Sequence, residues 1–436
     1  MQRLAFLPLL LLPAAALSAD APPVVAIQKI IDATYPALDD LYKHIHAHPE
    51  LALHEEKTAA RLAKELAAAG FAVTPKVGGH GVVAVFKNGK GPTILVRADM
   101  DALPIEEKTG LAYASKEHVR DADGKLVGVM HACGHDVNVT CLVGTARVLV
   151  ALKDRWSGTL VFIGQPAEEI GAGARAMLAD GLFTRFPRPD FALALHCDAR
   201  YPAGHVNWRI GQLQANVDSV TILVRGKGAH GAAPHAAIDP IVIAARLVLD
   251  LQTISSRERD PLDPVVVTVG SIHGGTKHNI IPSEVKLELT VRTVNDATRK
   301  KTLDAITRMS KAAARAAAAP EPSIQIALDD YTPALENDPA LTKKVVGILR
   351  DTLGPDRVHE RPMSLGGEDF SQYVRAGVPG CYFFLGSAAP ERVEAAKRGG
   401  PPLAFTHTDA YYPVPEPTIK TGVLSMIATV MKLAPK

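Results

Sequence analysis

The segment His131-Ala132-Cys133-Gly134-His135-Asp136 places a cysteine and a histidine two residues apart, beside a glycine. A thiolate and an imidazole with this spacing on a tight turn can face one borderline-soft divalent cation. A buried cysteine beside surface histidines would have the same sequence. The pair therefore indicates a metal site only if the fold brings further ligands to it.

A pair of carboxylates provides the second chemical signal. Glu168 and Glu169 follow the apolar run Thr159–Gly164, which we expect to be a buried strand. Open α/β sheets bind ligands at the carboxyl ends of their strands. On non-helical backbone the two side chains point in different directions, so one can bind a metal while the other acts as a general base in hydrolysis. A solvated acidic loop is the alternative interpretation.

Two single histidines occupy similar positions. His196 ends the apolar run that begins at Phe191, and His407 follows the last expected strand, Cys381–Leu385. A lone histidine is more often structural than a ligand, but these two together with the cysteine and carboxylates could form a two-metal site. Spacing alone does not show that they converge. Three other histidines, His44, His46 and His48, lie on different faces of an expected helix and are interpreted as structural.

The elements that would position these residues alternate between helices and buried strands. This alternation predicts an α/β fold with a mostly parallel sheet that helices cover on both faces. Expected helices are Val24–Gly70, Asp136–Leu152, Pro339–Leu353 and Glu416–Leu433; expected strands are Gly81–Phe86, Thr93–Arg97, Thr159–Gly164, Phe191–His196 and Cys381–Leu385.

The middle of the chain has a different order of elements: strand, helix, strand, strand, helix, strand. These are Val217–Arg225, Asp239–Ser256, Pro264–Ser271, Glu284–Val291, Ala297–Ala318 and Ser323–Leu328. This is the ferredoxin-like arrangement. We therefore expect an α+β domain at 215–329, inserted between two parts of a larger domain at 20–214 and 330–436.

Composition narrows the classes of function. The 436 residues include 48 Lys and Arg against 46 Asp and Glu, a net charge of +2, and only 5% are aromatic. Neither a basic platform nor a stacking surface for nucleic acid is indicated. A serine-nucleophile elbow, a phosphate-binding loop and a dinucleotide fingerprint are also absent from the sequence. The four cysteines (Cys133, Cys141, Cys197, Cys381) lack a disulfide-framework spacing, so we expect buried free thiols, one of which binds metal.

The N-terminus predicts export. Arg3 precedes a small and apolar run from Leu4 to Leu17, which ends at Ser18-Ala19. This pattern is typical of a secretory signal, here residues 1–19. The run is shorter than the roughly 20 residues that span a bilayer, although an uncleaved anchor is the alternative. We expect a periplasmic or secreted mature protein that is not held in a membrane.

Five motifs in order resemble one known superfamily. They are His48-Pro49-Glu50-Leu51, the segment Arg97–Pro104, the segment His131–Asp136, Gln165-Pro166-Ala167-Glu168-Glu169 and Gly366-Gly367-Glu368-Asp369-Phe370. Together they resemble the aminoacylase/carboxypeptidase superfamily of metallo-amidohydrolases, in the branch of hippurate hydrolases, auxin-conjugate amidohydrolases and N-acetyl-diaminopimelate deacetylases. The resemblance extends from about Ala33 to Met431.

This resemblance implies a two-metal catalytic domain. By position, the metal ligands would be Cys133, His135, Glu169, His196 and His407. Glu168 would be the general base. The two ions would be zinc or manganese, with cobalt or nickel as further possibilities.

The resemblance also implies that the inserted domain is a lid and dimerisation domain. His230 would reach the active site of the partner subunit in a homodimer and stabilise the oxyanion. Asn279 and Arg292 would bind the carboxylate of the substrate, a role that suits the two parallel hydrogen bonds of a guanidinium. Two departures from the family pattern are present. Asn138 at a usual histidine changes the surroundings of the metal ligands, which tune metal affinity. Thr408-Asp409 after the last ligand leaves the acyl specificity open.

The expected function is hydrolysis of the amide bond of hippurate-like N-acyl amino acids by metal-activated water. An exported dipeptidase or carboxypeptidase is the alternative within the same enzyme class. A catalytically inactive binding protein on the same fold is the alternative from another class.

Overall fold

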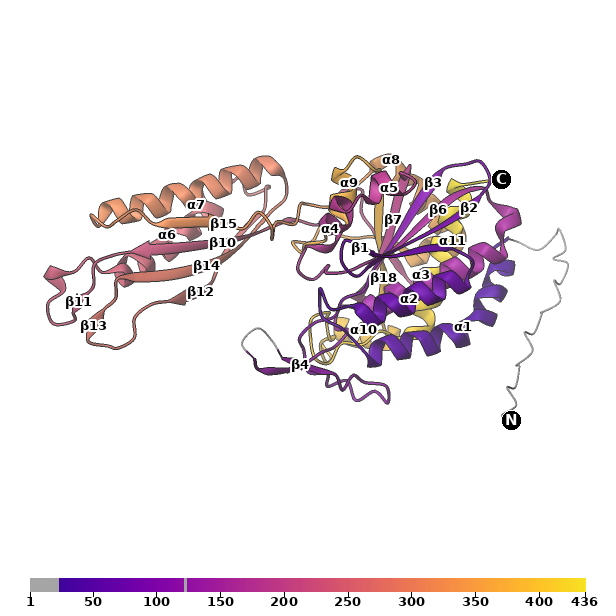
Figure 1. Cartoon of the computed structure of the whole chain (residues 1–436), viewed down its shortest axis with the longest axis horizontal. Coiled ribbons are helices and arrows are strands. Elements are labelled where there is room, and N and C mark those ends of the chain that lie inside the picture. The colour runs from indigo at the N-terminus through magenta and orange to yellow at the C-terminus, as the bar shows by residue number, and fades with distance from the viewer. Residues whose placement is uncertain (1–22, 121–123) are drawn as a thin grey trace, which may run out of the picture.

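The computed structural model describes residues 23–120 and 124–436. The expected signal segment, 1–19, lies outside the described residues. The chain forms a larger domain and a smaller one that extends away from it (Figure 1).

An eight-stranded sheet forms the centre of the larger domain. Its strands, in order across the sheet, are β1 (Ala72–Val77), β2 (Gly81–Asn88), β6 (Gly158–Gln165), β3 (Thr93–Asp99), β7 (Phe191–Pro202), β18 (Gly380–Ala388), β8 (Val206–Trp208) and β17 (Val358–Glu360). The four central strands β6, β3, β7 and β18 are parallel. The strands β1 and β2 on one side and β8 on the other run antiparallel to an inner neighbour. The predicted mostly parallel sheet of an α/β fold is confirmed.

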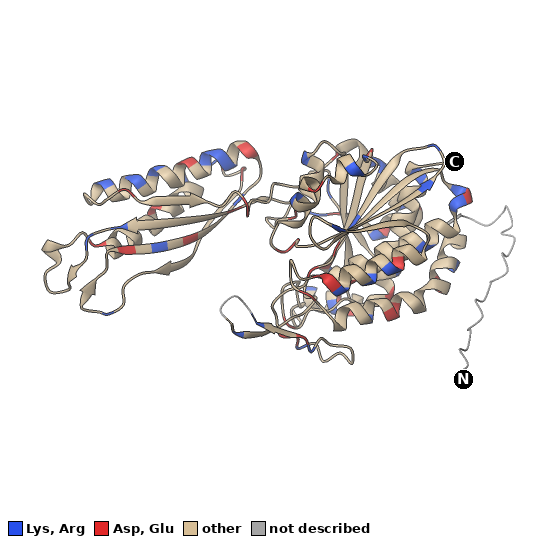
Figure 2. Ribbon diagram, in the orientation of Figure 1, with Lys and Arg blue, Asp and Glu red and all other residues tan. Residues whose placement is uncertain are grey.

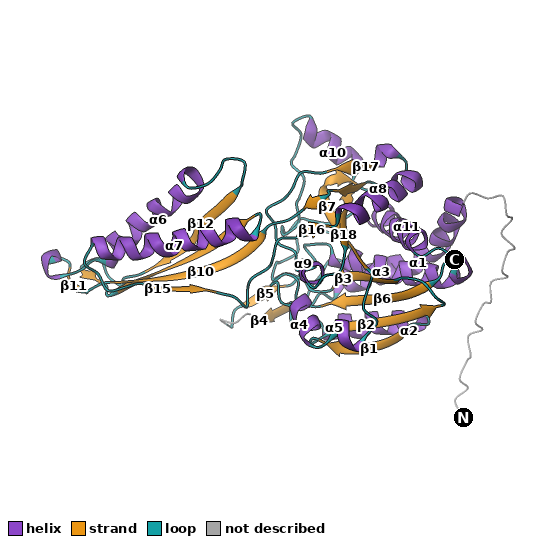
Figure 3. Cartoon of the chain, turned by 90° about the horizontal axis from the view of Figure 1, so that it is seen from above, coloured by secondary structure: helices purple, strands orange, loops and turns teal. Residues whose placement is uncertain are grey.

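Helices cover both faces of this sheet (Figure 3). Along β6, Leu160 and Phe162 enter the core on one face, while Val161 and Ile163 enter the core on the other. Such a strand is apolar at every position because neither face meets water. The helices of the first face are α1 (Pro23–Ala47), α2 (Glu56–Ala68), α3 (His135–Ala151), α8 (Pro339–Leu353) and α11 (Pro415–Leu433); those of the second are α4 (Gly173–Ala179), α5 (Leu182–Arg185) and α9 (Ser371–Arg375).

The first helical segment differs from the prediction. One helical region was expected from Val24 to Gly70, but α1 ends at Ala47 and α2 begins at Glu56. Pro49 disfavours helical backbone at His48, and Leu51 forms a bridge with Ala102 instead. The interruption brings this segment against the loop that follows β3.

The smaller domain consists of β10 (Asn216–Arg225), α6 (Pro240–Arg257), β12 (Val265–His273), β14 (Glu284–Thr293), α7 (Asp296–Ala316) and β15 (Ser323–Ile326). Its antiparallel sheet has the order β12-β14-β10-β15. Buried and half-buried residues alternate along β10, because one face packs against α6 and α7. This is the ferredoxin-like order that the sequence indicates.

The surface of both domains carries charges of both signs. Lys and Arg are interspersed with Asp and Glu along α7 and over the helices of the larger domain (Figure 2). On α7, Lys300 pairs with Asp304 and Arg308 pairs with Glu258. Among the described helices, none is long and apolar enough to cross a membrane.

Short elements complete the described chain. They are α10 (Pro390–Lys397), β4 (His118–Arg120), β5 (Leu126–Gly128), β9 (Gly211–Gln212), β11 (Ala229–His230), β13 (Ile280–Ile281), β16 (Glu336–Asn337) and the 3₁₀ turns Lys153–Arg155, Pro234–Ala236 and Pro355–Arg357. The pair β11–β13 lies at the end of the smaller domain that is far from the larger domain (Figure 1).

Candidate active site

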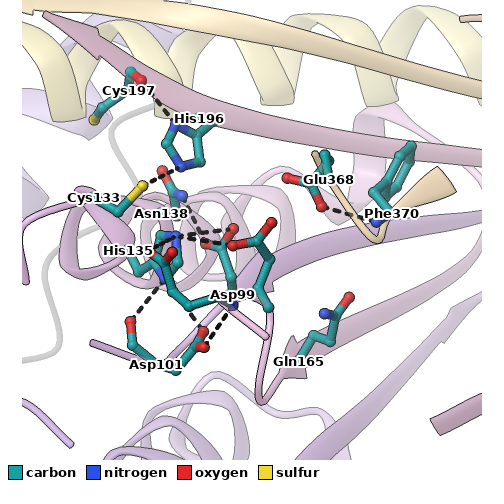
Figure 4. A network of polar contacts seen from close by, with 12 residues as sticks. Asp99, Asp101, Cys133, His135, Asn138, Gln165, His196, Cys197, Glu368 and Phe370 are labelled. Carbon is teal, nitrogen blue, oxygen red and sulfur yellow. Dashed lines mark hydrogen bonds and ion pairs between the residues drawn. The ribbon is translucent and has the colours of Figure 1, made fainter. Parts of the chain in front are cut away.

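Residues from separate elements meet at one edge of the large sheet. Asp99 ends β3, Glu168 and Glu169 follow β6, and His196 lies in β7. Because these strands are parallel neighbours, the carboxyl ends of β3 and β6 bring Asp99 and the two glutamates to the same place. The prediction that His196 ends its strand is wrong, because β7 continues to Pro202 and His196 lies midway along it. Cys133 and His135 reach this edge from the start of α3, and Figure 4 shows Cys133 directed at His196.

The turn before α3 is shaped by a glycine. Gly134 has φ of +87°, and a Cβ there would lie 3.0 Å from the Cβ of Cys197. Only glycine adopts this backbone without strain and allows so close an approach to β7. The turn places the Cys133 Sγ atom 3.4 Å from Nε2 of His196 and 3.2 Å from Nε2 of His407.

The predicted ligands form two overlapping donor sets. In each set the donor atoms lie within 4.8 Å of one another, and both sets contain Cys133. The first adds His135 and His196, and the second adds Glu169 and His407. Thiolate, imidazole and carboxylate in this arrangement would suit divalent cations.

Hydrogen bonds orient two of the imidazoles for this role. Nδ1 of His135 donates to the backbone oxygen of Asp101 at 2.8 Å, and Nδ1 of His196 donates to that of Cys197 at 2.8 Å. The Nε2 lone pair of each ring is then free to face the site. Nε2 of His135 and Oε1 of Glu169 are buried without any hydrogen-bond partner among the described residues. Such orphaned acceptors are expected where a cation binds, so the residues present fit a metal centre.

The electrostatics of the site also favour a cation. Burial raises the pKa of the Cys133 thiol well above its usual range, and the charges of Glu169 and Glu168 add to this effect. Burial raises the pKa of Glu169 to about 7. A bound divalent cation would reverse these shifts, because it stabilises the deprotonated forms.

Glu168 has a different environment from its neighbour. Burial raises its pKa well above the usual value, and the negative charges of Glu368 and Glu169 act in the same direction. Its Oε2 atom lies 3.9 Å from Nε2 of His135. Its carboxylate lines the cavity beside the donor sets, where it can accept a proton.

The backbone before Glu168 is strained. Ala167 has φ of +52°, and His407 has φ of +65°, which are unusual for residues other than glycine. Oε1 of the buried Glu55 accepts a hydrogen bond of 2.7 Å from the Ala167 amide and holds this turn. Strain of this kind is found at functional sites, where the surrounding structure maintains it.

A buried network of charges supports the site from below. The Arg97 guanidinium donates to Glu368 at 2.8 Å and to Asp369 at 3.1 Å. Gln165 donates to Asp369 at 2.7 Å, and the Tyr382 hydroxyl donates to Glu368 at 2.6 Å. The network links the ends of β3 and β6 to the segment before α9, and Figure 4 shows Gln165 and Glu368 of this network beside the candidate ligands. The sequence marked all of these residues except Tyr382 as motif members, without indicating this structural role.

Asn138 also supports the candidate ligands through a buried carboxylate. Its Nδ2 atom donates to Oδ1 of Asp99 at 2.7 Å, and the other oxygen of Asp99 lies 3.6 Å from Nε2 of His135. Asn138 therefore positions a carboxylate beside a candidate ligand. His46 acts similarly from α1: its ring is buried and contacts Asp136 at 2.7 Å, in keeping with the structural interpretation.

A cavity of about 730 Å³ opens over the donor sets. Its walls include Glu168, Glu169, His196, His407 and, from the smaller domain, Arg292. The predicted carboxylate-binding arginine is therefore brought to the same space as the predicted general base.

All four cysteines are buried and free, as expected.

The two remaining predicted residues lie elsewhere. His230 in β11 and Asn279 before β13 line a second hollow at the outer end of the smaller domain. The backbone oxygen of Asn279 accepts a hydrogen bond from Gly231, which fixes the two segments together. Figure 1 shows that these strands lie far from β18 and the sheet edge that carries the donor sets. The structure does not bring His230 or Asn279 to Glu168 of the same chain.

One group in the cavity wall was not predicted from the sequence. Arg361 and Asp198 line the cavity, although neither belongs to a motif considered above. Arg361 follows the three-residue strand β17, which has no recognisable periodicity. The only signal was an arginine after a short β-branched and polar run, which is too common to be informative.

Comparisons with known proteins agree with this geometry. A model of Peptidase family M20/M25/M40 matches residues 95–397. Thermostable carboxypeptidase 1 from Saccharolobus solfataricus is 35% identical over 399 residues, covering 90% of this chain and 94% of the relative. N-acetyl-L-cysteine deacetylase from Bacillus subtilis is 38% identical over 351 residues, covering 79% of each. A solved structure from Bacillus subtilis, described as a dinuclear metal binding peptidase from the M20 family, matches with a TM-score of 0.75 at 28% identity, covering 92% of this chain and 99% of that one.

Proposed function

The chain belongs to Peptidase family M20/M25/M40 and is a hydrolase of that family, and from this premise we propose that it hydrolyses the amide bond of N-acyl amino acids. The observation that carries the proposal is the joining of three features in one cavity. These are the two donor sets that share Cys133, the free carboxylate of Glu168 and the guanidinium of Arg292.

The two donor sets would hold two divalent ions. Cys133, His135, Glu169, His196 and His407 would hold them. When bound, such ions lower the pKa of water and polarise the carbonyl of a bound amide. Zinc or manganese suits this set of ligands, and cobalt or nickel is also compatible with it.

Glu168 would move the proton. A general base must lie within reach of the attacking water and hold the proton long enough to deliver it to the leaving amine. The raised pKa of Glu168, caused mainly by burial and then by Glu368 and Glu169, favours the protonated form that this second step requires. Glu169 is the less suited of the two, because its Oε2 atom lies 3.4 Å from Nε2 of His407 and it shares a donor set with Cys133.

Arg292 would bind the carboxylate of the substrate. It is half-buried in β14, and its Nη1 atom lies 3.7 Å from the position that a Cβ on Gly367 would occupy. A Cβ at Gly367 would lie 2.6 Å from Cγ2 of Val217, so glycine allows this segment to pack closely beside the guanidinium. A guanidinium can form two parallel hydrogen bonds with a carboxylate and thereby fix the scissile amide relative to Glu168.

A second copy of the chain would complete the site. His230 and Asn279 lie together at the outer end of the smaller domain, exposed or half-buried around a hollow of about 640 Å³. We place them in the active site of the partner subunit of a homodimer, where His230 would donate a hydrogen bond to the developing oxyanion. Asn279 would act there beside it.

The mature protein would work outside the cytoplasm. The support is the charged start, apolar run and small residues of 1–19. Cell fractionation with an antibody against the chain tests this proposal: recovery only from the cytoplasm, at full length, would contradict it.

A second candidate function is removal of a C-terminal amino acid from a peptide. It is favoured by the carboxypeptidase relatives from Saccharolobus solfataricus. Release of free amine from N-acetyl and N-benzoyl amino acids, compared with unblocked and N-blocked dipeptides, separates the two. Higher kcat/KM for the simple N-acyl amino acids supports our proposal, and higher kcat/KM for peptides contradicts it.

A further inference from the structure

Arg361 is a buried cation in the cavity wall that the proposed chemistry does not use. It follows β17, and its backbone amide donates a hydrogen bond of 2.9 Å to the Trp208 carbonyl. The backbone carbonyl of Arg361 accepts a hydrogen bond from the Arg209 side chain. The residue is only 3% exposed, yet it lines the catalytic cavity. The backbone is therefore fixed, and the guanidinium is held at the cavity surface.

The charge of Arg361 is only partly compensated by its surroundings. The nearest carboxylate, Asp198, is already bound by Arg200 through hydrogen bonds of 2.9 and 2.7 Å. Nη1 of Arg361 approaches Asp198 only to 3.5 Å, and its Nε and Nη1 atoms have no hydrogen-bond acceptor among the described residues. Two guanidinium groups thus share one carboxylate. A buried cation with free donors is costly unless a ligand compensates it.

One face of Arg361 is covered by an aromatic ring. The guanidinium carbon lies 3.6 Å from the centroid of Phe384. This stacking fixes the plane of the guanidinium but leaves its edge, which carries the N–H donors, unsatisfied. Phe384 in turn lies beside His196, with ring centroids 6.1 Å apart. Arg361 is therefore one side chain removed from the donor sets.

Arg361 and Arg292 belong to different walls of the cavity. Arg292 comes from the smaller domain, near Gly367 and the acidic Asp330 and Asp218. Arg361 comes from the edge of the large sheet, near Asp198 and Phe384. If the α-carboxylate of a substrate binds Arg292 and its amide lies at the donor sets, the group that extends toward Arg361 is the acyl group.

We propose that Arg361 forms an anion subsite for the acyl group, and that the preferred substrates are N-acyl amino acids whose acyl chain ends in a carboxylate. The proposal rests on the proposed amidohydrolase function. A carboxylate can accept two parallel hydrogen bonds from the free donors of Arg361. The negative charge of this carboxylate would also compensate the second of the two guanidinium groups that share Asp198. A neutral acyl group would leave both donors unpaired.

The test compares substrates that differ only in the end of the acyl chain. Succinyl and glutaryl amino acids are paired with their ω-amides, which have nearly the same shape without the charge, and kcat/KM is measured with the metal-loaded protein. We expect the acids to be preferred by about tenfold or more. An acid-to-amide ratio near one for both chain lengths would overturn the subsite while leaving hydrolysis of N-acetyl amino acids, and hence the proposed function, intact.

Variants locate the effect. Arg361→Met is expected to reduce the ratio to near one, and Arg361→Lys to an intermediate value because lysine keeps the charge without the planar fork. Arg357→Met removes an exposed guanidinium from the same segment outside the cavity and should leave the ratio unchanged. Persistence of the ratio in both folded Arg361 variants would overturn the proposal. The pair N-acetyl-glutamate and N-acetyl-glutamine differs in the charge of the amino-acid side chain and not of the acyl group. If Arg361→Met changed the acid-to-amide ratio for this pair and not for the acyl pairs, the proposal would also be overturned.

Binding separates failure of the subsite from failure of the function. Calorimetric titration of the metal-loaded protein with free glutarate and with glutaramate gives two dissociation constants. Tighter binding of glutarate that Arg361→Met abolishes supports the subsite even if no amide is hydrolysed, a result that would contradict the proposed function alone. Equal binding of the two ligands would overturn the subsite.

Discussion

Glu168 and Glu169 are chain neighbours with different partners, and this division is the basis of the proposed chemistry. Oε2 of Glu169 lies 3.4 Å from Nε2 of His407, within one donor set. Both glutamates line the cavity, but Glu168 lies close to the buried Glu368 and Asp369. The strained φ of Ala167 turns the backbone just before the pair and allows them to diverge.

Substitution of the two glutamates should separate catalysis from metal binding. Glu168→Gln is expected to reduce kcat by about 100- to 10,000-fold with two metal ions per chain retained, because only proton transfer is lost. Glu169→Gln is expected to lower the metal content itself. Elemental analysis of the purified variants, together with kcat on an N-acyl amino acid, provides the measurement. Near wild-type turnover of Glu168→Gln would rule out its role as the base.

At the residue scale, the candidate ligands could be predicted and the cavity wall could not. Cys133 and Glu169 each sit in a short motif of chemically distinctive residues, and His407 was marked by its place after the last expected strand and by the resemblance. Arg361 has no such signal, and its significance depends on sharing Asp198 with Arg200 and on stacking against Phe384. Such contacts arise between distant segments and leave no local signal in the sequence.

At the element scale, the site depends on α3 keeping its place on the sheet. Arg147 of α3 forms an ion pair of 2.6 Å with Glu65 of α2, which also accepts a hydrogen bond of 2.8 Å from Arg61. Burial raises the pKa of Glu65, but the hydrogen bonds and charges of Arg61 and Arg147 more than offset it, so the pKa is lowered overall. The ionised form is therefore stabilised in the folded chain.

This ion pair should give pH-dependent stability. Because the pKa of Glu65 is lower in the folded state, its contribution is complete above the unfolded pKa, about 4.3, and is lost as the pH falls through the folded pKa. Glu65→Gln should lower the free energy of unfolding by about 0.5–1 kcal/mol at pH 7. The difference from wild type should shrink toward zero in acid.

Urea unfolding of both proteins across this pH range measures the effect. Glu360→Gln, at an exposed position without an ion pair among the described residues, is the control and should have little effect at any pH. A Glu65→Gln difference that stays constant from pH 7 into acid would contradict the account.

Long elements were predictable from the sequence, and short ones were not. The helix Pro339–Leu353 was predicted with its observed bounds, and β10 differs by one residue, because both have sustained periodicity. The three-residue strands β8 and β17 were missed, since their pairing at the edge of the sheet is decided by tertiary contacts. The strand β1 was missed because Pro75 and the positive φ of Lys76 interrupt its pattern.

At the scale of the whole molecule, the two domains divide the proposed catalytic groups. The larger domain contains the donor sets and Glu168, and the smaller domain brings Arg292 to the same cavity. His230 lies at the outer end of the smaller domain. The sequence indicated the inserted domain through its order of elements. It did not indicate that Asn279 lies at the outer end of this domain while Arg292 lines the catalytic cavity, because that depends on the three-dimensional arrangement of the strands.

Mixing two inactive variants tests the proposed sharing of sites between subunits. Glu168→Gln and His230→Ala are each expected to be nearly inactive. In a mixed dimer one of the two sites would combine an intact Glu168 with an intact His230. After subunit exchange, about a quarter of wild-type activity should return. Absence of recovery in mixtures that contain verified mixed dimers, or a fully active monomer, would contradict the role of His230.

The most direct test of the central claim is amine release from N-acyl amino acids before and after metal removal. The mature chain is assayed untreated, after chelation, and after zinc, manganese or cobalt is restored, with the folded state checked by circular dichroism at each stage. The account predicts that chelation abolishes amine release without unfolding the chain and that at least one metal restores it, whereas Glu168→Gln stays inactive with the same metal. Undiminished amine release from a chelated, metal-free and folded protein would contradict the account.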